Sequence, residues 1–129
     1  FPTEPLSKAH VIQVCEIINS GIHPIQNLKI LKEITERFQL DSDGKSKWAH
    51  DWIERGFKGL EETLKKTAGS YCFGNTLTAA DLFVVPQVYN ARRFAVDMSP
   101  FPTIDSIEKE CLKLDAFQKA EPSKQPDTQ

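Results

Sequence analysis

The feature that most constrains the fold is the apolar run inside residues 78–94, TAADLFVVPQVYNARRF. Between residues 82 and 89 the run has almost no polar face. A helix of a soluble protein that is apolar all round must be surrounded by other elements. We therefore predict that residues 78–94 form the central helix of an all-helical domain.

The start of this helix has its own signature. Thr78 and Asp81 have the spacing of a capping box, in which the hydroxyl of the cap accepts the backbone N–H of Asp81 and the carboxylate accepts the N–H of the cap. Leu77 and Leu82 are spaced to close a hydrophobic staple over this start. Pro86 removes one backbone hydrogen bond and predicts a bend near Leu82.

Further helices are predicted where apolar residues recur three and four positions apart. The first, beginning at Leu6, has the stripe Val11, Val14, Cys15, Ile18 and Ile22. The second has the stripe Ile25, Leu28, Leu31, Ile34 and Phe38. The third, over about 46–67, has the stripe Ala49, Ile53, Phe57, Leu60 and Leu64. The helix after the central one has the stripe Ile104, Ile107, Cys111 and Leu114. With no alternating, strand-like segment in the chain, the sequence predicts an all-α bundle of five to six helices.

Several local signals predict where helices begin, end and approach one another. Residues 41–45 form a polar loop, Gly69 is a natural C-cap for the third helix, and Thr103 is an N-cap. Gly56 and Gly59 lie on one line of the third helix, where they could let another backbone come close. Glycine costs about 1 kcal/mol relative to alanine inside a helix, so two together indicate tight packing.

The chain divides into three parts. Residues 1–5 are typical of a linker, residues 6–120 make the helical domain, and residues 121–129 are expected to form a loose tail. Residues 115–118 predict a short final turn with its own capping pair. The start at Phe1 fits a segment of a longer protein, and equally a trimmed chain end.

Composition excludes several function classes. The formal net charge is −2 with no block of like charge, which argues against a nucleic-acid surface or an anionic membrane partner. No apolar run reaches the ~18 residues of a membrane span. Cys15, Cys72 and Cys111 are odd in number and far apart, which favours buried structural thiols in a reducing compartment. We expect a cytoplasmic protein.

The pair Arg92 and Arg93 is the best local candidate for function. Adjacent side chains on a helix point about 100° apart, so the two guanidiniums cannot share one role. One fits a solvated surface charge, and the other can hold a carboxylate through paired N–H bonds.

The three histidines allow weaker hypotheses. His50 and Glu54 stand at i and i+4, a spacing that could place both on one metal, but two ligands do not make a site. His10 is typical of a surface imidazole. His23 lies at the glycine–proline break of residues 21–27, where a side chain can face a cleft or simply line a solvated joint. From the residues alone, no complete active site is present.

Several segments resemble a known family. Residues 74–81 resemble the capping-box and staple motif of the C-terminal domain of glutathione transferases. A more specific set, in this order along the chain, resembles the zeta class of these enzymes: residues 21–28, 67–72, 85–94, 101–104 and 125–128.

The resemblance implies a fold, an activity and site residues. The parent enzyme would be a dimer that uses glutathione to convert maleylacetoacetate to its trans isomer in phenylalanine and tyrosine breakdown, and that also acts as a transferase. Arg93 would hold a carboxylate of the dicarboxylate substrate. On the glutathione side would lie Asn27 and Leu28, with His23 where a glutamine is common and Lys29 where a serine is usual. The thiol-activating residues of the family lie in a thioredoxin-like N-terminal domain that residues 1–129 do not include.

Two alternatives stay open. The chain could be a non-catalytic helical interaction module of the transferase type, or a metal-binding bundle built around His50 and Glu54. Binding of glutathione or of a carboxylate ligand would separate the enzyme from the module, and elemental analysis would detect the metal.

Overall fold

Residues 1–126 fold into six α-helices and two 3-10 helices. The computed structural model describes residues 1–126 of the 129. The elements are α1 (Pro5–Gly21), η1 (His23–Gln26), α2 (Leu28–Phe38), α3 (Ser42–Leu64), α4 (Ala79–Arg93), α5 (Pro102–Cys111), α6 (Asp115–Lys119) and η2 (Pro122–Lys124). Within residues 1–126 no strand is present, and only two isolated β-bridges occur, in the turn region 68–76. The predicted fold class is confirmed.

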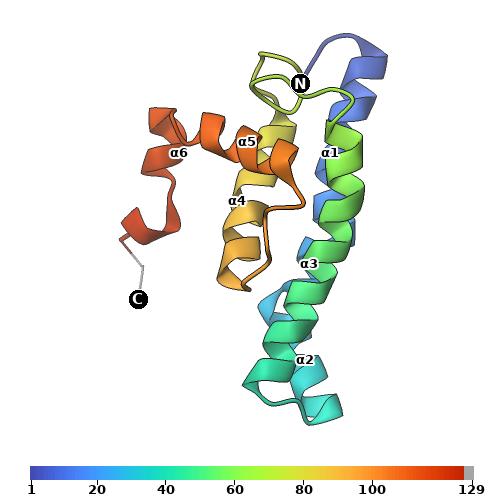
Figure 1. Ribbon diagram of the computed structural model, residues 1–129, viewed down its shortest axis with the longest axis vertical. Helices are drawn as coiled ribbons and strands as arrows, with labels where there is room; N and C mark the ends of the chain where they lie inside the picture. The colour runs from blue at the N-terminus through green and yellow to red at the C-terminus, as the bar shows by residue number, and fades with distance from the viewer. Residues whose placement is uncertain (127–129) are drawn as a thin grey trace.

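Helix α4 packs between α1 and α5 (Figure 1). The two longest helices, α1 and α3, run along the length of the molecule, with α2 at one end. Helix α4 lies beside them and packs mainly against α1 and α5, while α6 follows the end of α5 on the side of the molecule away from α1 and α3. Helix α4 therefore connects the packing of α1 with that of α5.

The main core joins the stripes of four helices. The stripes of the first and third helices are buried throughout, as predicted, and in α5 the residues Ile104, Ile107 and Cys111 are buried. Phe57 and Phe101 meet edge to face with ring centroids 5.5 Å apart. A smaller cluster under α2 contains Leu31, Ile34 and Ala49.

The start of α4 is held by a buried carboxylate. Asp81 accepts hydrogen bonds from the backbone N–H of Thr78 at 2.8 Å and from its hydroxyl at 3.1 Å, and the two residues form a capping box. Its other oxygen accepts the N–H of Cys72 at 2.8 Å. Asp81 therefore fixes both the helix start and the turn that precedes it.

The prediction that α4 is buried all round is wrong. Leu82 is 55 % exposed, and Phe83 and Tyr89 are exposed as well, whereas Val84 and Val88 are buried. Helices α1 and α5 cover only part of the surface of α4, and these three side chains lie outside the covered part. Apolar residues on a helix face favour burial of that face. They do not indicate whether an element of the same chain covers it.

The second predicted stripe is also only partly buried. Leu31 and Ile34 are buried, but Leu28 is 78 % exposed and Phe38 is 66 % exposed. Both exposed residues lie at the ends of α2, beyond the part that packs on α3.

The predicted bounds of the third helix are wrong at both ends. Residues 41–45 are not a loop, because the Asp41 carboxylate accepts the N–H of Gly44 at 2.7 Å and α3 begins at Ser42. The helix ends at Leu64 with Lys65 as its cap, so Gly69 is not a C-cap. A β-carbon on Gly69 would lie 2.7 Å from the carbonyl oxygen of Gly74, so this glycine permits a close backbone approach instead.

The two glycines inside α3 differ. A β-carbon on Gly56 would overlap Cγ1 of Ile22, whereas one on Gly59 would meet nothing within 4 Å among the described residues. Tight packing is confirmed at Gly56, where the close neighbour is a side chain rather than a backbone. It is wrong at Gly59.

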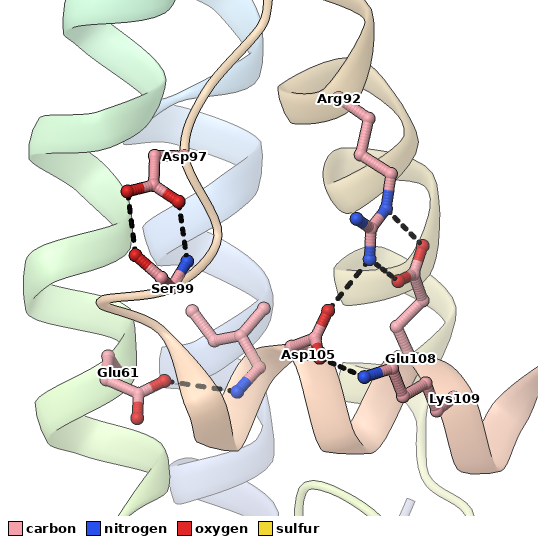
Figure 2. A network of polar contacts seen from close by, with 8 residues as sticks. Glu61, Arg92, Asp97, Ser99, Asp105, Glu108 and Lys109 are labelled. Atoms are coloured by element: carbon pink, nitrogen blue, oxygen red, sulfur yellow. Dashed lines mark hydrogen bonds and ion pairs between the residues drawn. The ribbon is translucent and has the colours of Figure 1, made fainter.

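Helix α5 is capped by a residue from another helix. The N-cap is Phe101, which has no capping side chain, so the prediction for Thr103 is wrong. The buried Glu61 of α3 accepts the N–H groups of Thr103 at 3.0 Å and Ile104 at 3.1 Å instead. Figure 2 shows this carboxylate facing the start of α5. Helix α6 likewise has Leu114 at its N-cap, so the predicted capping pair does not form.

The two ends of the described chain also contain helical structure. Glu4 caps α1, which begins at Pro5, and residues 122–124 form η2 within the tail expected to be loose. The rest of that expectation falls partly on residues 127–129, which lie outside the described residues. Among residues 1–126, no helix has the length and apolar character that a membrane span requires.

Candidate functional site

The predicted break between the first two helices is present and has a defined shape. Helix α1 ends at Gly21, and Pro24 stands in the first turn of η1. Asn27 then caps α2, since its Oδ1 accepts the N–H of Ile30 at 3.1 Å. The chain therefore changes direction at the start of α2, and residues 27–29 lie at this turn.

Two side chains tie this break to the rest of the domain. Trp48 of α3 donates its Nε1–H to the carbonyl oxygen of Ile25 at 3.1 Å. Gln26 donates from Nε2 to Oε1 of Gln87 on α4 at 3.2 Å, and both glutamines are buried. The break is thus held in a fixed position relative to α4.

The last turn of α4 forms the opposite wall. His50 of α3 places Nδ1 3.2 Å from the carbonyl oxygen of Phe94, and because a carbonyl can only accept, Nδ1 is the donor. Ala95 follows with a left-handed φ of 56°, which ends the helix. This contact positions Phe94 and, beside it, Arg93.

The structure separates the two adjacent arginines, as helix geometry requires. Arg92 turns toward α5, where its Nη2 lies 2.5 Å from Glu108 and 2.8 Å from Asp105 (Figure 2). Hydrogen bonding to Glu108, and then to Asp105, raises the pKa of Arg92. The guanidinium of Arg92 therefore forms ion pairs that link α4 to α5, and it is not an unpaired surface charge.

Arg93 points elsewhere. Its guanidinium carbon lies 5.7 Å from the centroid of the Phe94 ring, a cation–π distance. Within residues 1–126 no carboxylate lies within ion-pair distance of this guanidinium. Its N–H groups are therefore available to a ligand.

A cavity of about 460 Å³ opens between the break and the end of α4. All five residues predicted to bind substrate or cofactor line it, together with Gln26, Leu31, Asn90 and Phe94: His23, Asn27, Leu28, Lys29 and Arg93. The formally charged lining groups are the cations Lys29 and Arg93, and the described lining includes no carboxylate. The cavity can hold an anion, but its lining offers neither a thiol nor a hydroxyl group as a nucleophile.

The other sequence candidates lie away from this cavity. Glu54 pairs with Lys58 at 3.3 Å, and the partner of His50 is a carbonyl oxygen, so neither side chain is directed at a shared ion. His10 is exposed, as predicted.

The three thiols are buried, as predicted. Desolvation raises the pKa of Cys15 and Cys72, and raises that of Cys111 to about 12. The Asp81 carboxylate adds to each shift. A thiol in such a setting is a poor nucleophile at neutral pH.

Comparison with known proteins decides the family. The family model described as "Glutathione S-transferase, C-terminal domain" matches residues 27–120. The chain belongs to this family.

Relatives of this transferase domain are isomerases. Maleylacetoacetate isomerase of Mus musculus is 46 % identical over 128 residues, which cover 99 % of this chain and 56 % of the relative. A holo structure of maleylpyruvate isomerase, a bacterial zeta-class protein, superimposes with a TM-score of 0.95 at 38 % identity and covers 99 % of this chain and 61 % of its own. The chain spans little more than half the length of these relatives.

A further solved structure carries ligands. Maleylacetoacetate isomerase from Anaeromyxobacter dehalogenans, with dicarboxyethyl glutathione and citrate in its active site, superimposes on this transferase domain with a TM-score of 0.93. It is 37 % identical and covers 99 % of this chain and 58 % of its own. The resemblance to the zeta class is therefore confirmed by sequence and by structure.

Sequence reasoning missed three polar residues of the transferase domain. Asn90 stands one turn before Arg93, and this i, i+3 spacing would have placed both on one face. Gln87 interrupts an otherwise apolar run, a signal for a buried polar contact. Its partner Gln26 had no local signal, because the pair joins positions 61 residues apart.

Proposed function

We propose that this chain is the helical, substrate-binding half of a glutathione-dependent maleylacetoacetate isomerase of the zeta class. One observation carries the proposal: the cavity between η1 and α4 gathers Arg93, Lys29 and His23 without an acidic side chain in its lining. A dicarboxylate with a glutathione adduct is the kind of anionic ligand that such a lining attracts. The named relatives, and the anionic ligands bound in one of them, support the same substrate class.

In this proposal the chain supplies binding and orientation. Arg93 holds one carboxylate of maleylacetoacetate, and its ring contact with Phe94 limits the positions that the guanidinium can take. Asn27, Leu28, Lys29 and His23 lie on the glutathione side. The reaction adds the glutathione thiolate to the cis double bond, allows rotation about the resulting single bond, and eliminates glutathione from the trans product. The thiolate would be generated in the part of the enzyme that precedes this segment.

The same proposal covers the surroundings of the enzyme. We infer a cytoplasmic homodimer that acts in the breakdown of phenylalanine and tyrosine and that also transfers glutathione to small substrates. The mass of the natural polypeptide tests the underlying assumption. A mass larger by about 80 residues, one small domain, is expected.

Kinetics of Arg93→Ala in the complete enzyme test the carboxylate role. An arginine–carboxylate contact of about 2–3 kcal/mol corresponds to roughly a hundredfold rise in KM for the dicarboxylate. Arg93→Lys keeps the charge but loses the paired donors, so an intermediate KM is expected. Arg37→Ala is the matched control, since Arg37 is an exposed arginine of α2 that does not line the cavity. Unchanged kinetics of Arg93→Ala would remove the role.

One observation favours a second function. The exposed apolar side chains of α4, among them Leu82 and Phe83, are typical of a surface that another polypeptide covers. A non-catalytic interaction module would have such a surface and would bind neither glutathione nor a dicarboxylate. Calorimetric titration with both compounds separates the two functions.

A further inference from the structure

The end of α4 is closed by a Schellman motif. The N–H of Val96 donates to the carbonyl oxygen of Ala91 at 2.9 Å. The N–H of Ala95 donates to the carbonyl oxygen of Arg92 at 3.0 Å. Together these bonds pair two of the carbonyl groups that a helix end leaves without a partner. They do not reach the carbonyl oxygen of Phe94, the cap residue, and no backbone N–H among residues 1–126 donates to it.

The donor for this carbonyl group comes from α3. Nδ1 of His50 donates to the carbonyl oxygen of Phe94 at 3.2 Å, and the contact is partly buried. Ala95, the next residue, has a left-handed φ of 56°, a conformation that is unfavourable for a residue with a β-carbon. The bond from His50 therefore holds a turn whose backbone conformation is strained.

The ring of Phe94 in turn supports Arg93. Phe94 is partly buried and packs against both apolar clusters of the domain, whereas Arg93 is exposed. The guanidinium carbon of Arg93 lies 5.7 Å from the centroid of this ring. A long exposed side chain loses rotamer freedom when it binds a ligand, and a ring that already restricts the side chain reduces that loss. The position of Phe94 thus affects how tightly Arg93 can bind an anion.

We propose that His50 is a positioning residue for the carboxylate site and acts on Arg93 through the backbone and the ring of Phe94. His50 is not part of the described lining of the cavity that Arg93 lines, so it acts without contact with the ligand. It keeps the guanidinium near the orientation in which the guanidinium binds a carboxylate. The inference rests on the carboxylate-binding role proposed for Arg93.

Two variants of nearly equal shape test the hydrogen bond. The amide nitrogen of asparagine is as many bonds from the backbone as Nδ1, so His50→Asn retains a donor, whereas His50→Leu has none. In the complete enzyme we expect His50→Leu to raise KM for the dicarboxylate roughly threefold to tenfold, from the cost of ordering one long side chain, with kcat unchanged. His50→Asn should keep the parent KM. The matched control is His10→Leu, because His10 is an exposed histidine of α1 outside the cavity lining.

A double variant shows whether His50 acts through Arg93. Arg93→Ala removes the guanidinium, so the addition of His50→Leu should change KM no further. The same factor in both backgrounds would indicate a general disturbance of the fold and would overturn the proposal. An equal rise of KM in His50→Asn and His50→Leu would also overturn it.

The outcomes separate this inference from the proposed function. If Arg93→Ala raises KM and His50→Leu does not, the positioning role is overturned and the carboxylate site stays intact. If Arg93→Ala leaves KM unchanged, the carboxylate role fails and the positioning role fails with it.

A measurement without substrate completes the test. In NMR spectra of the ligand-free enzyme, the ring current of Phe94 should displace the side-chain resonances of Arg93, and the displacement should decrease in His50→Leu and persist in His50→Asn. His50→Ala, which lacks a donor and adds no bulk, gives the same comparison if His50→Leu does not fold. A displacement that is equal in the parent enzyme and in the donor-free variants would overturn the proposal.

Discussion

Glu61 offers a sharp test of how this domain is held together. The residue is 2 % exposed, and its carboxylate accepts the backbone N–H groups of Thr103 and Ile104. Pro102 has no N–H, and the N–H of Asp105 bonds to the carbonyl oxygen of residue 101. Glu61 therefore satisfies both remaining donors in the first turn of α5, and its charge lies at the positive end of the helix dipole.

The variant Glu61→Ala should be strongly destabilised. A hydrogen bond to a charged group contributes about 1.5–3 kcal/mol, and the buried N–H of Ile104 and the partly buried N–H of Thr103 would lose their partner at once. We expect a loss of about 3–4 kcal/mol in the free energy of unfolding, out of the roughly 5–15 kcal/mol of a typical domain. Glu61→Gln keeps one acceptor oxygen and should lose about 2 kcal/mol.

Urea denaturation followed by circular dichroism measures these changes. The matched control is Glu62→Ala, because Glu62 is the next residue, is exposed, and pairs with Lys65 on the surface of the same helix. Its midpoint should coincide with that of the parent protein. A Glu61→Ala variant within about 1 kcal/mol of the parent, or equal to Glu62→Ala, would refute capping from α3.

Three other predictions follow from the structure. Gly56→Ala should destabilise the protein by about 1–3 kcal/mol because its β-carbon would overlap a packed isoleucine. Gly59→Ala should stabilise it by up to about 1 kcal/mol, since nothing lies within 4 Å of the new β-carbon and alanine favours the helix. Changes of the same sign in the free energy of unfolding, measured by urea denaturation, would contradict this prediction. Hydrogen bonding to Lys109, and then to the neighbouring arginine, lowers the pKa of Asp105 in the folded protein. The unfolded state therefore binds more protons near pH 4, the free energy of unfolding falls as the pH drops below that value, and Asp105→Asn should flatten this dependence in acid titrations of stability. Burial raises the pKa of Cys72, so the thiol should not react with a disulfide reagent such as dithiobis(nitrobenzoate) at pH 8 until the protein is denatured; rapid reaction of the native protein would contradict its burial.

The sequence determined those features that depend on neighbours one helical turn apart. The buried stripes of α1 and α3 follow from apolar residues at spacings of three and four, and the capping box of Thr78 and Asp81 lies within four positions. The sequence also predicts the break around Pro24, because Gly21 and Pro24 lie within four positions of each other. Asp41, which caps α3, also has a local signal, but a polar segment such as residues 41–45 is equally typical of a loop.

Only the tertiary structure decided the features that join distant positions. Glu61 caps α5 across 42 residues, and Gln26 meets Gln87 across 61. Helix geometry required Arg92 and Arg93 to diverge, but the carboxylates of α5 decided that Arg92 is the paired one, whereas Arg93 has no carboxylate partner among residues 1–126. Such contacts depend on how whole helices pack against one another, and the sequence around a polar residue does not indicate which distant residue it will meet.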